Sequence, residues 1–272
     1  MSTSKWCVIG TDPRMAKLAF ELETNGEHVL YVKSKAWGYQ LERSISEFQP
    51  DYIVFPIQPL ELAVPNIDRD IFKHTPTCFV GRLTSDWAQV LNDMNCPVKK
   101  YLENEEFIWL NAKLTAEGFI AAFYLHEKQT IAGKKFVITG FGRVSKLLAA
   151  QLKKMDAFPL IVVRSLEQLA EAKAMGYEAE ILRPAIACDD VFFINTIPAA
   201  WLTDDYVHKI SKAKTFYDIA SAPGCLNCNE PLTVPYHLYT SLPGQFIEND
   251  AASLLSSCIQ RLSKQSEGGS MC

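Results

Sequence analysis

Residues 135–145 read Lys-Phe-Val-Ile-Thr-Gly-Phe-Gly-Arg-Val-Ser and give the clearest indication of the fold class. Its β-branched first part predicts a strand, and the amphipathic residues that follow predict a helix. Gly140 and Gly142 allow a tight turn in which backbone N–H groups at the helix N-terminus approach a pyrophosphate. The third glycine of the usual G-x-G-x-x-G pattern is Ser145 here. The stretch predicts dinucleotide binding, and the alternative is a helix-capping turn without a ligand.

Outward from this stretch, short apolar runs alternate with amphipathic segments, which predicts parallel sheets with crossover helices. In the first half we expect strands at 6–9, 28–32, 52–55, 78–80 and 98–101, helices at 14–23, 38–47 and 85–91, and an irregular loop at 56–75. In the second half we expect strands at 135–139, 160–163, 191–195, 215–219 and 237–240, and helices at 143–155, 166–175 and 245–262.

The predicted fold class is α/β, with two Rossmann-like doubly wound parallel-sheet domains joined by a linking helix and the cofactor on the C-terminal one. Residues 1–129 would form the substrate-side domain, 130–262 the NADP-binding domain and 263–272 a disordered tail. Thr115 is expected to cap the linking helix at 114–125, with Glu117 in its first turn.

Composition excludes several classes of protein. The 272 residues carry a net charge of −4, so there is no basic footprint for nucleic acid or anionic membranes. The apolar runs are too short for a membrane span or a signal-peptide core, and we expect a cytoplasmic protein. Its eight cysteines are then reduced. Cys225 and Cys228 form a C-x-x-C without a second pair, so no metal site is predicted.

The end of the strand at 160–163 indicates the cofactor. NAD enzymes usually have Asp or Glu at this place to bind the ribose 2′-OH. Arg164 and Ser165 stand there instead, and an Arg suits a 2′-phosphate, which favours NADP. The alternative is a solvated Arg at a strand end.

Three further loops leave the carboxyl ends of predicted strands, where open α/β sheets bind their ligands. They begin at Asn195, Asp218 and Ser241. The residues expected to bind the cofactor are Gly140, Phe141, Gly142, Arg143, Val144, Arg164, Ser165, Asn195, Thr196, Ile197, Pro198, Asp218, Ala220, Ser221, Leu242 and Gly244.

Several of these motifs together resemble those of the dipicolinate synthase A chain family, and the matches extend from residue 10 to about residue 250. The matching stretches are 10–14 (GTDPR), 115–118 (TAEG), 140–143 (GFGR), 164–165 (RS), 194–198 (INTIP), 218–221 (DIAS), 223–224 (PG) and 242–244 (LPG). Two positions depart from the family pattern: Ser145 replaces a glycine, and Cys225 replaces the second glycine of a Pro-Gly-Gly turn.

The resemblance implies oxidation of a dihydrodipicolinate-type precursor to pyridine-2,6-dicarboxylate with a nicotinamide acceptor. It also implies a role in sporulation and a second, flavoprotein-like subunit. A dicarboxylate in an interdomain cleft would need charge pairing, for which Arg14 is the first candidate. Asp12, Thr115, Glu117 and Ser221 are the other candidate substrate or catalytic residues, although Asp12 and Glu117 also suit plain helix capping and dipole roles.

Two other functions stay open. One is a 2-hydroxyacid-dehydrogenase-like reductase of another small carboxylate, although such enzymes usually have an Arg after the Asn-Thr pair, where Ile197 and Pro198 stand. The other is a non-catalytic NADP-sensing subunit, because the sequence shows no obvious His–carboxylate pair. The sequence also leaves open whether the chain forms a homo-oligomer.

Overall fold

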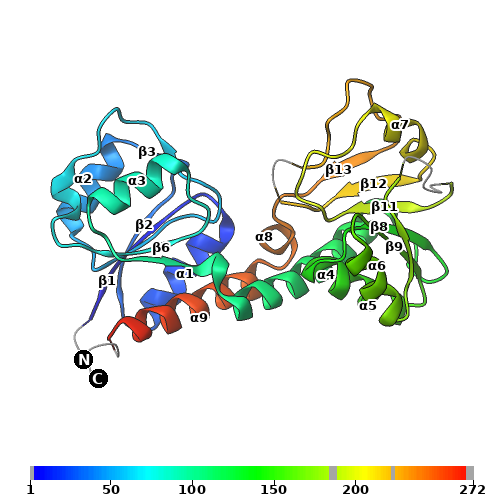
Figure 1. The fold of residues 1–272 in the computed structure, drawn as a ribbon. Helices are drawn as coiled ribbons and strands as arrows, with labels where there is room; N and C mark the ends of the chain where they lie inside the picture. The colour runs from blue at the N-terminus through cyan, green and yellow to red at the C-terminus, as the bar shows by residue number, and fades with distance from the viewer. Residues whose placement is uncertain (1–2, 184–188, 222–223, 268–272) are drawn as a thin grey trace. The chain divides into compact units, whose positions relative to one another are not determined.

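The computed structural model describes residues 3–183, 189–221 and 224–267, and the chain divides into two compact units (Figure 1). The first unit combines the residues before position 112 with those from position 248 onward, and the second comprises residues 112–247. Both are α/β, as the alternating sequence pattern predicts.

The first unit contains a five-stranded parallel sheet in the order β2-β1-β4-β6-β7. The strands are β1 (Lys5–Ile9), β2 (His28–Val32), β4 (Tyr52–Val54), β6 (Thr77–Val80) and β7 (Val98–Lys100). Helices α2 (Tyr39–Phe48) and α3 (Ser85–Asp93) cover one face, where the buried rings of Trp37 and Trp87 meet edge to face. The region expected as an irregular loop includes β5 (Glu61–Leu62), which pairs with β3 (Ala36–Trp37), and a 3-10 turn at Arg69–Phe72.

The other face of this sheet is covered by α1 (Pro13–Thr24) and by the last helix of the chain, α9 (Glu248–Glu267). Leu255 and Ile259 of α9 are fully buried in one cluster with Met15 and Leu18 of α1. The structure therefore differs from the expected domain division, which gave this helix to the cofactor domain. The apolar stripe of α9 finds its partner on α1. The helix also continues to residue 267, into the segment expected to be a disordered tail.

The second unit contains a six-stranded parallel sheet in the order β10-β9-β8-β11-β12-β13. Its strands are β8 (Lys135–Thr139), β9 (Phe158–Val163), β10 (Glu178–Ile181), β11 (Phe192–Asn195), β12 (Thr215–Asp218) and β13 (Tyr236–Leu238). Numbered along the chain this is the order 3-2-1-4-5-6 of doubly wound dinucleotide-binding sheets, which reverses between β8 and β11. The predicted Rossmann-type fold is confirmed.

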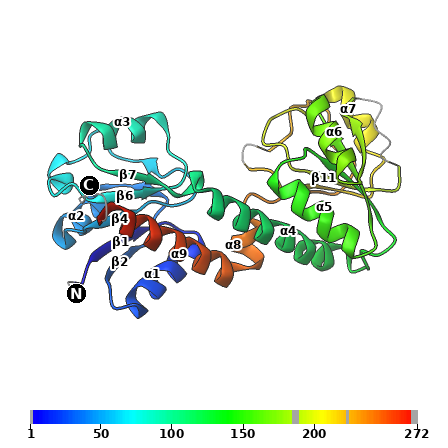
Figure 2. The same ribbon diagram turned by 60° about the horizontal axis from the view of Figure 1, so that its bottom comes forward.

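Helices α4 (Glu105–Glu127), α5 (Arg143–Lys154) and α6 (Leu166–Ala174) cover one face of this sheet (Figure 2). The short helix α7 (Asp204–Ile210) packs on the other face through Val207 and Ile210. The sequence pattern predicts neither strand β10 nor helix α7. The segment expected as one final helix is divided into α8 (Leu242–Phe246) and α9.

Helix α4 begins nine residues earlier than the sequence pattern predicts. Its first turn holds Glu105 and Glu106, and the side chain of Asn104 accepts a hydrogen bond from the Phe107 N–H at 2.9 Å. The prediction that Thr115 caps this helix and that Glu117 lies in its first turn is wrong, because the helix begins at Glu105 and Asn104 provides its cap. None of the helices in the described part of the chain is both long and apolar enough to cross a membrane.

Candidate functional site

The turn between β8 and α5 contains two glycines that differ in backbone conformation and in surroundings. Gly140 has φ +87°, and a Cβ built on it would lie 2.9 Å from the Thr196 Oγ1 and 3.1 Å from the Ile197 Cγ1. Only glycine suits both that backbone conformation and that contact. Gly140 therefore allows the turn to pack directly against the loop that follows β11, at the point where the strand order reverses.

Gly142 is the N-cap residue of α5, and its backbone is in the ordinary extended region. A Cβ built here would meet no atom within 4 Å. The absence of a side chain thus leaves open space beside the helix N-terminus, where the first N–H groups of a helix lack intrahelical partners. This space fits the close approach of a pyrophosphate, as the sequence pattern predicts.

Ser145 fills the position of the missing third glycine without loosening the turn. It is fully buried, and its hydroxyl donates to the Gly140 carbonyl oxygen at 2.7 Å. Phe141 is buried beside it, Val144 packs partly against the core, and Arg143 is half-buried in the first turn of α5. The small serine preserves close helix–strand packing and adds a hydrogen bond that glycine lacks.

At the carboxyl end of β9, Arg164 is exposed. Ser165 caps α6 by accepting the Gln168 N–H at 3.3 Å. Hydrogen bonds from its own backbone N–H and from the Ser165 hydroxyl lower the pKa of the Glu167 carboxyl. Arg164 is available for a 2′-phosphate, whereas the Ser165 hydroxyl already serves the helix start.

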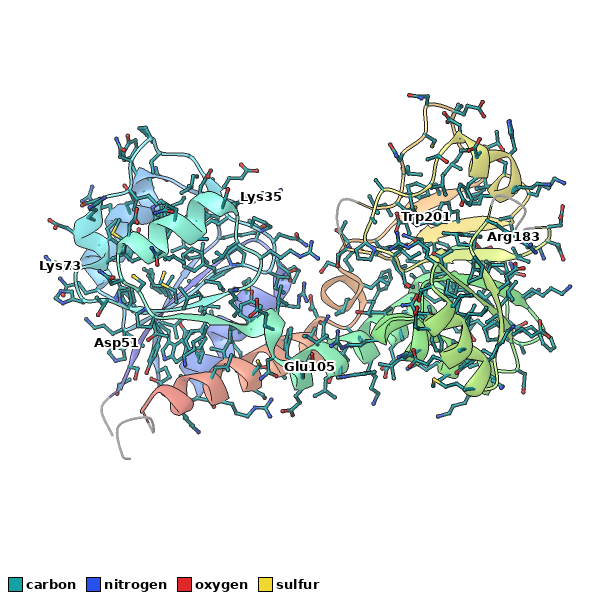
Figure 3. All side chains as sticks on the ribbon, in the orientation of Figure 1. Lys35, Asp51, Lys73, Glu105, Arg183 and Trp201 are labelled. Atoms are coloured by element: carbon teal, nitrogen blue, oxygen red, sulfur yellow. The ribbon has the colours of Figure 1, made fainter. Side chains whose placement is uncertain are left out.

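A buried polar network joins the carboxyl ends of β8, β11 and β12. Asn195 is completely buried, and its Oδ1 accepts from the Thr139 hydroxyl at 2.7 Å and from the Ile197 N–H at 3.1 Å. The same oxygen accepts from the Trp201 indole at 3.0 Å; Trp201 is labelled in Figure 3. Its Nδ2 donates to the Asp218 Oδ1 at 2.8 Å. Asn195 therefore positions the loop after β11, and a direct contact with the cofactor stays a prediction.

Asp218 is the second centre of this network and is also completely buried. Its Oδ1 accepts from the Ala220 N–H at 3.2 Å as well as from Asn195. Its Oδ2 accepts from the Cys225 N–H at 2.7 Å and from the Tyr236 hydroxyl at 3.1 Å. Burial and the nearby Asp218 raise the pKa values of both Tyr236 and the Cys225 thiol. Cys225, the second departure from the family pattern, is thus a buried residue whose backbone N–H fixes the loop after β12 to Asp218.

The remaining candidate cofactor residues lie around this network. Pro198 is exposed and Thr196 and Ser221 are half-buried, whereas Ile197 and Ala220 are buried. The side chain of Thr196 donates to the Thr139 carbonyl oxygen at 2.6 Å. These loops all leave the carboxyl edge of the sheet, as predicted.

Leu242 and Gly244 lie on α8 and are buried. A Cβ built on Gly118 of α4 would lie 3.1 Å from the Leu242 Cβ, so the glycine allows α4 and α8 to pack closely. This accounts for the glycine of the 115–118 motif and for Leu242 by packing. Cofactor contact through α8 stays a prediction.

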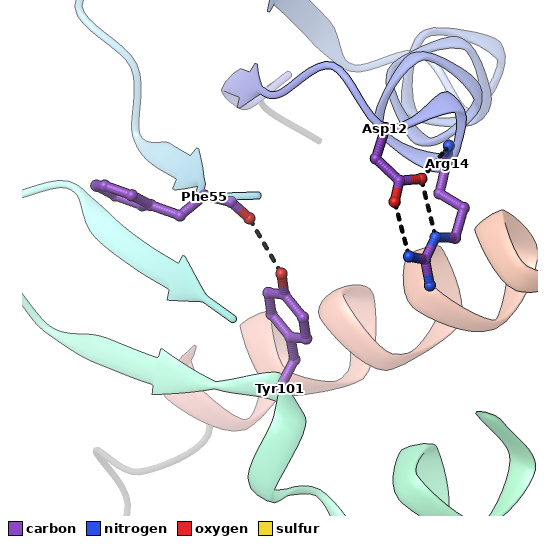
Figure 4. Close-up of polar contacts among 4 residues, drawn as sticks. All are labelled: Asp12, Arg14, Phe55 and Tyr101. Atoms are coloured by element: carbon purple, nitrogen blue, oxygen red, sulfur yellow. Dashed lines mark hydrogen bonds and ion pairs between the residues drawn. The ribbon is translucent and has the colours of Figure 1, made fainter. Parts of the chain in front are cut away.

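In the first unit, Asp12 and Arg14 form a bidentate ion pair at the carboxyl end of β1 (Figure 4). The Asp12 carboxylate accepts from the Arg14 backbone N–H at 3.0 Å, which caps α1, and from the Arg14 Nε at 2.9 Å and Nη2 at 2.7 Å. The Arg14 side chain is only 6% exposed. Sequence spacing predicts the cap but not the bidentate ion pair. That ion pair is formed by a guanidinium that is buried, not by a surface one.

Tyr101, which no sequence motif indicates, lies near that pair. It is fully buried, and its hydroxyl donates to the Phe55 carbonyl oxygen at 3.1 Å. Burial raises its pKa, and the opposing charges of Arg14 and Asp12 also act on it. Nothing in the local sequence signals this placement, because it depends on strands distant along the chain.

Of the other candidates, Thr115 is buried and Glu117 is half-buried, both in the middle of α4. They belong to the second unit with Ser221, whereas Asp12 and Arg14 belong to the first. Their convergence on one substrate stays a prediction.

Comparisons with known proteins bear on this arrangement. Neither a protein-family model nor a curated protein sequence matches the chain. Among solved structures, the dipicolinate synthase A chain from Bacillus subtilis is similar over 97% of each chain, at 21% identity and a TM-score of 0.76. Its counterpart from Bacillus halodurans is similar over 96% of this chain and 98% of that one, at 22% identity and a TM-score of 0.74. A structure described as a putative D-3-phosphoglycerate dehydrogenase from Ralstonia solanacearum is similar over 98% of this chain and 95% of that one, at 13% identity and a TM-score of 0.58. The chain thus has the α/β fold of these oxidoreductases.

Proposed function

We propose that the protein is an NADP-dependent oxidoreductase that oxidises a dihydrodipicolinate-type cyclic dicarboxylate to pyridine-2,6-dicarboxylate in sporulation. The observation that carries the proposal is the full-length similarity to two dipicolinate synthase A chains, with TM-scores of 0.76 and 0.74 against 0.58 for the dehydrogenase-type structure. The matched motifs at the turns of both units support the same assignment.

The residues of the second unit fit a nicotinamide dinucleotide. The open side of Gly142 and the first N–H groups of α5 would bind the pyrophosphate. Arg164 would pair with the 2′-phosphate. Thr196, Pro198 and Ser221, which are partly accessible, would lie along the nicotinamide side. When bound, the nucleotide supplies the hydride acceptor, and the protein supplies orientation and electrostatics.

For the substrate, the protein must pair carboxylates and accept a proton. Arg14 has the planar fork that suits a carboxylate, and here that fork already holds Asp12. Aromatisation removes one hydride and one proton from the ring; the hydride goes to the nucleotide, and Glu117 is the candidate acceptor for the proton. Because aromatisation makes the oxidation favourable, a strong base is not required.

The test is steady-state turnover of dihydrodipicolinate with NADP⁺, by this protein alone and together with a flavoprotein-type second subunit. Formation of one NADPH per pyridine-2,6-dicarboxylate would support the proposal. Turnover of 2-hydroxy acids in its place would favour the reductase alternative. Tight NADP⁺ binding with no turnover in either setting would favour a sensing subunit, and the proposed activity would then be wrong.

A further inference from the structure

Asp218 lies in the interior of the second unit, where its carboxyl group is surrounded by hydrogen-bond donors. Its four hydrogen-bond partners among the described residues are all donors: two backbone N–H groups, an amide N–H and a phenol. An ionised carboxylate only accepts hydrogen bonds, whereas a protonated one must also donate. The four donors therefore fit the ionised form, held at the end of β12 with no exposed surface.

Hydrogen bonds from neutral donors stabilise such a charge without cancelling it. Within residues 3–183, 189–221 and 224–267, no Lys, Arg or His forms an ion pair with Asp218. An unpaired charge in a water-poor environment acts over a longer range than a charge in solvent. Asp218 thus leaves a net negative potential at the carboxyl end of β11 and β12.

That end of the sheet is where the nicotinamide half of a dinucleotide lies, because strands β11 to β13 form the second mononucleotide-binding half of the order 3-2-1-4-5-6. The oxidised nicotinamide ring is positively charged, and the reduced ring is neutral. Only the oxidised form gains from a fixed negative charge nearby.

We propose that the buried Asp218 carboxylate makes the nucleotide site prefer the oxidised cofactor over the reduced one. This preference rests on the proposed nicotinamide site. It would favour hydride transfer from the substrate to NADP⁺. Asp218 acts as a positioning residue and through its charge, without touching the ring, since its side chain is enclosed by Asn195, Cys225 and Tyr236. A site of this kind holds the hydride acceptor and releases the reduced product.

The magnitude follows from Coulomb attraction. At an effective dielectric constant of about 20, two unit charges within about 12 Å of each other attract strongly enough to change a dissociation constant about tenfold, and the expected effect applies if the ring binds within that range. Asp218→Asn keeps the shape and the carbonyl acceptor but removes the charge. It should weaken NADP⁺ binding about tenfold and change NADPH binding less than about twofold.

The experiment is calorimetric titration of NADP⁺ and NADPH into the full chain, the Asp218→Asn variant and a matched control, Tyr236→Phe. The control removes one hydrogen bond to the same carboxylate but keeps its charge, so the ratio of the two dissociation constants should stay at the native value. Circular dichroism of each variant checks the fold.

Equal weakening of both nucleotides in Asp218→Asn would overturn the inference, since it would mean that Asp218 only supports the loops. An unchanged ratio in that variant would overturn it too. If Asp218→Asn fails to fold, the native protein decides: preference for NADP⁺ by about tenfold supports the inference, and equal or reversed affinities overturn it. Absence of binding of either form to the native protein would instead mean that the proposed function is wrong.

Discussion

Replacing Gly142 by Val tests the cofactor site at its most specific point. Because nothing lies within 4 Å of the Cβ position and the backbone is extended, the native fold has room for the side chain. The cost to folding is limited to a poorer N-cap, about 1 kcal/mol. The same side chain would occupy the space that a pyrophosphate needs. Loss of two charge-assisted hydrogen bonds, each worth about 1.5–3 kcal/mol, should weaken NADP⁺ binding more than about 100-fold.

Gly140→Ala is the matched control, because it should show the opposite pattern. Its φ of +87° imposes about 1–2 kcal/mol of strain on a residue with a Cβ. The new methyl would also press on the Thr196 hydroxyl, whose hydrogen bond to Thr139 is worth about 1 kcal/mol. The free energy of unfolding should fall by about 2–3 kcal/mol, against about 1 kcal/mol for Gly142→Val.

The assay combines nucleotide titration by intrinsic fluorescence with urea unfolding followed by circular dichroism. Trp201 lies on the loop after β11 and contributes to the fluorescence signal there. The reasoning would be refuted if Gly142→Val bound NADP⁺ within about threefold of the native affinity. It would also fail if Gly142→Val were the less stable of the two variants, since Gly142 would then be a structural residue.

Three further predictions follow from single side chains. Arg164→Asp should reverse or erase a preference for NADP⁺ over NAD⁺, and equal affinities of the native protein for the two nucleotides would contradict the assignment. Arg14→Ala should raise the substrate KM roughly tenfold to hundredfold and leave NADP⁺ affinity nearly unchanged, because Arg14 belongs to the first unit; unchanged kinetics would make Arg14 purely structural. Burial, and then the neighbouring His126, lower the pKa of His237, so its contribution to stability is present above pH ~6.5 and lost as the pH falls below it. Urea unfolding at pH 7.5 and 5.5 should show a smaller loss for His237→Gln than for the native protein, and an equal loss would count against this origin.

The sequence predicts those parts of the fold whose signals are local. The run from Lys135 to Ser145 contains a strand, two glycines and the start of an amphipathic helix within eleven residues, and the structure confirms the strand, the turn and the helix start. Strand β10 has no such signal, because its sequence, Glu-Ala-Glu-Ile, has low strand propensity and forms only by pairing with β9. The start of α4 is ambiguous in the sequence, because Asn104 and Thr115 are both suitable N-cap residues and each is followed by Glu within one helical turn.

The candidate site is less predictable, because its polar contacts join residues far apart along the chain. Thr139, Asn195 and Asp218 belong to one hydrogen-bond network, although the first and the last are separated by 79 positions along the chain. No local sequence pattern specifies this network. Even the short-range pair Asp12–Arg14 is only half predictable. The spacing indicates a helix cap, but the burial of Arg14 depends on the sheet around it. The sequence thus indicates candidate loops at the carboxyl ends of the strands, whereas the hydrogen-bond partners of their side chains require the structure.

The two units hold carboxylates of different electrostatic consequence, the partly exposed Asp12 and the buried Asp218. Asp12 is paired with Arg14, so the carboxyl end of β1 contains a guanidinium and a carboxylate whose charges cancel. Among the described residues, Asp218 is held by hydrogen bonds from neutral donors, and we infer that it retains its charge. A dianionic substrate can therefore gain from Arg14 only by sharing or displacing Asp12, and its affinity is limited by that competition. A cationic nicotinamide ring meets no such competitor at Asp218. On these grounds we expect the second unit to be preorganised for the nucleotide, whereas the first would have to exchange an internal ion pair for one with the substrate. The dissociation constant of the substrate should therefore be larger than that of NADP⁺.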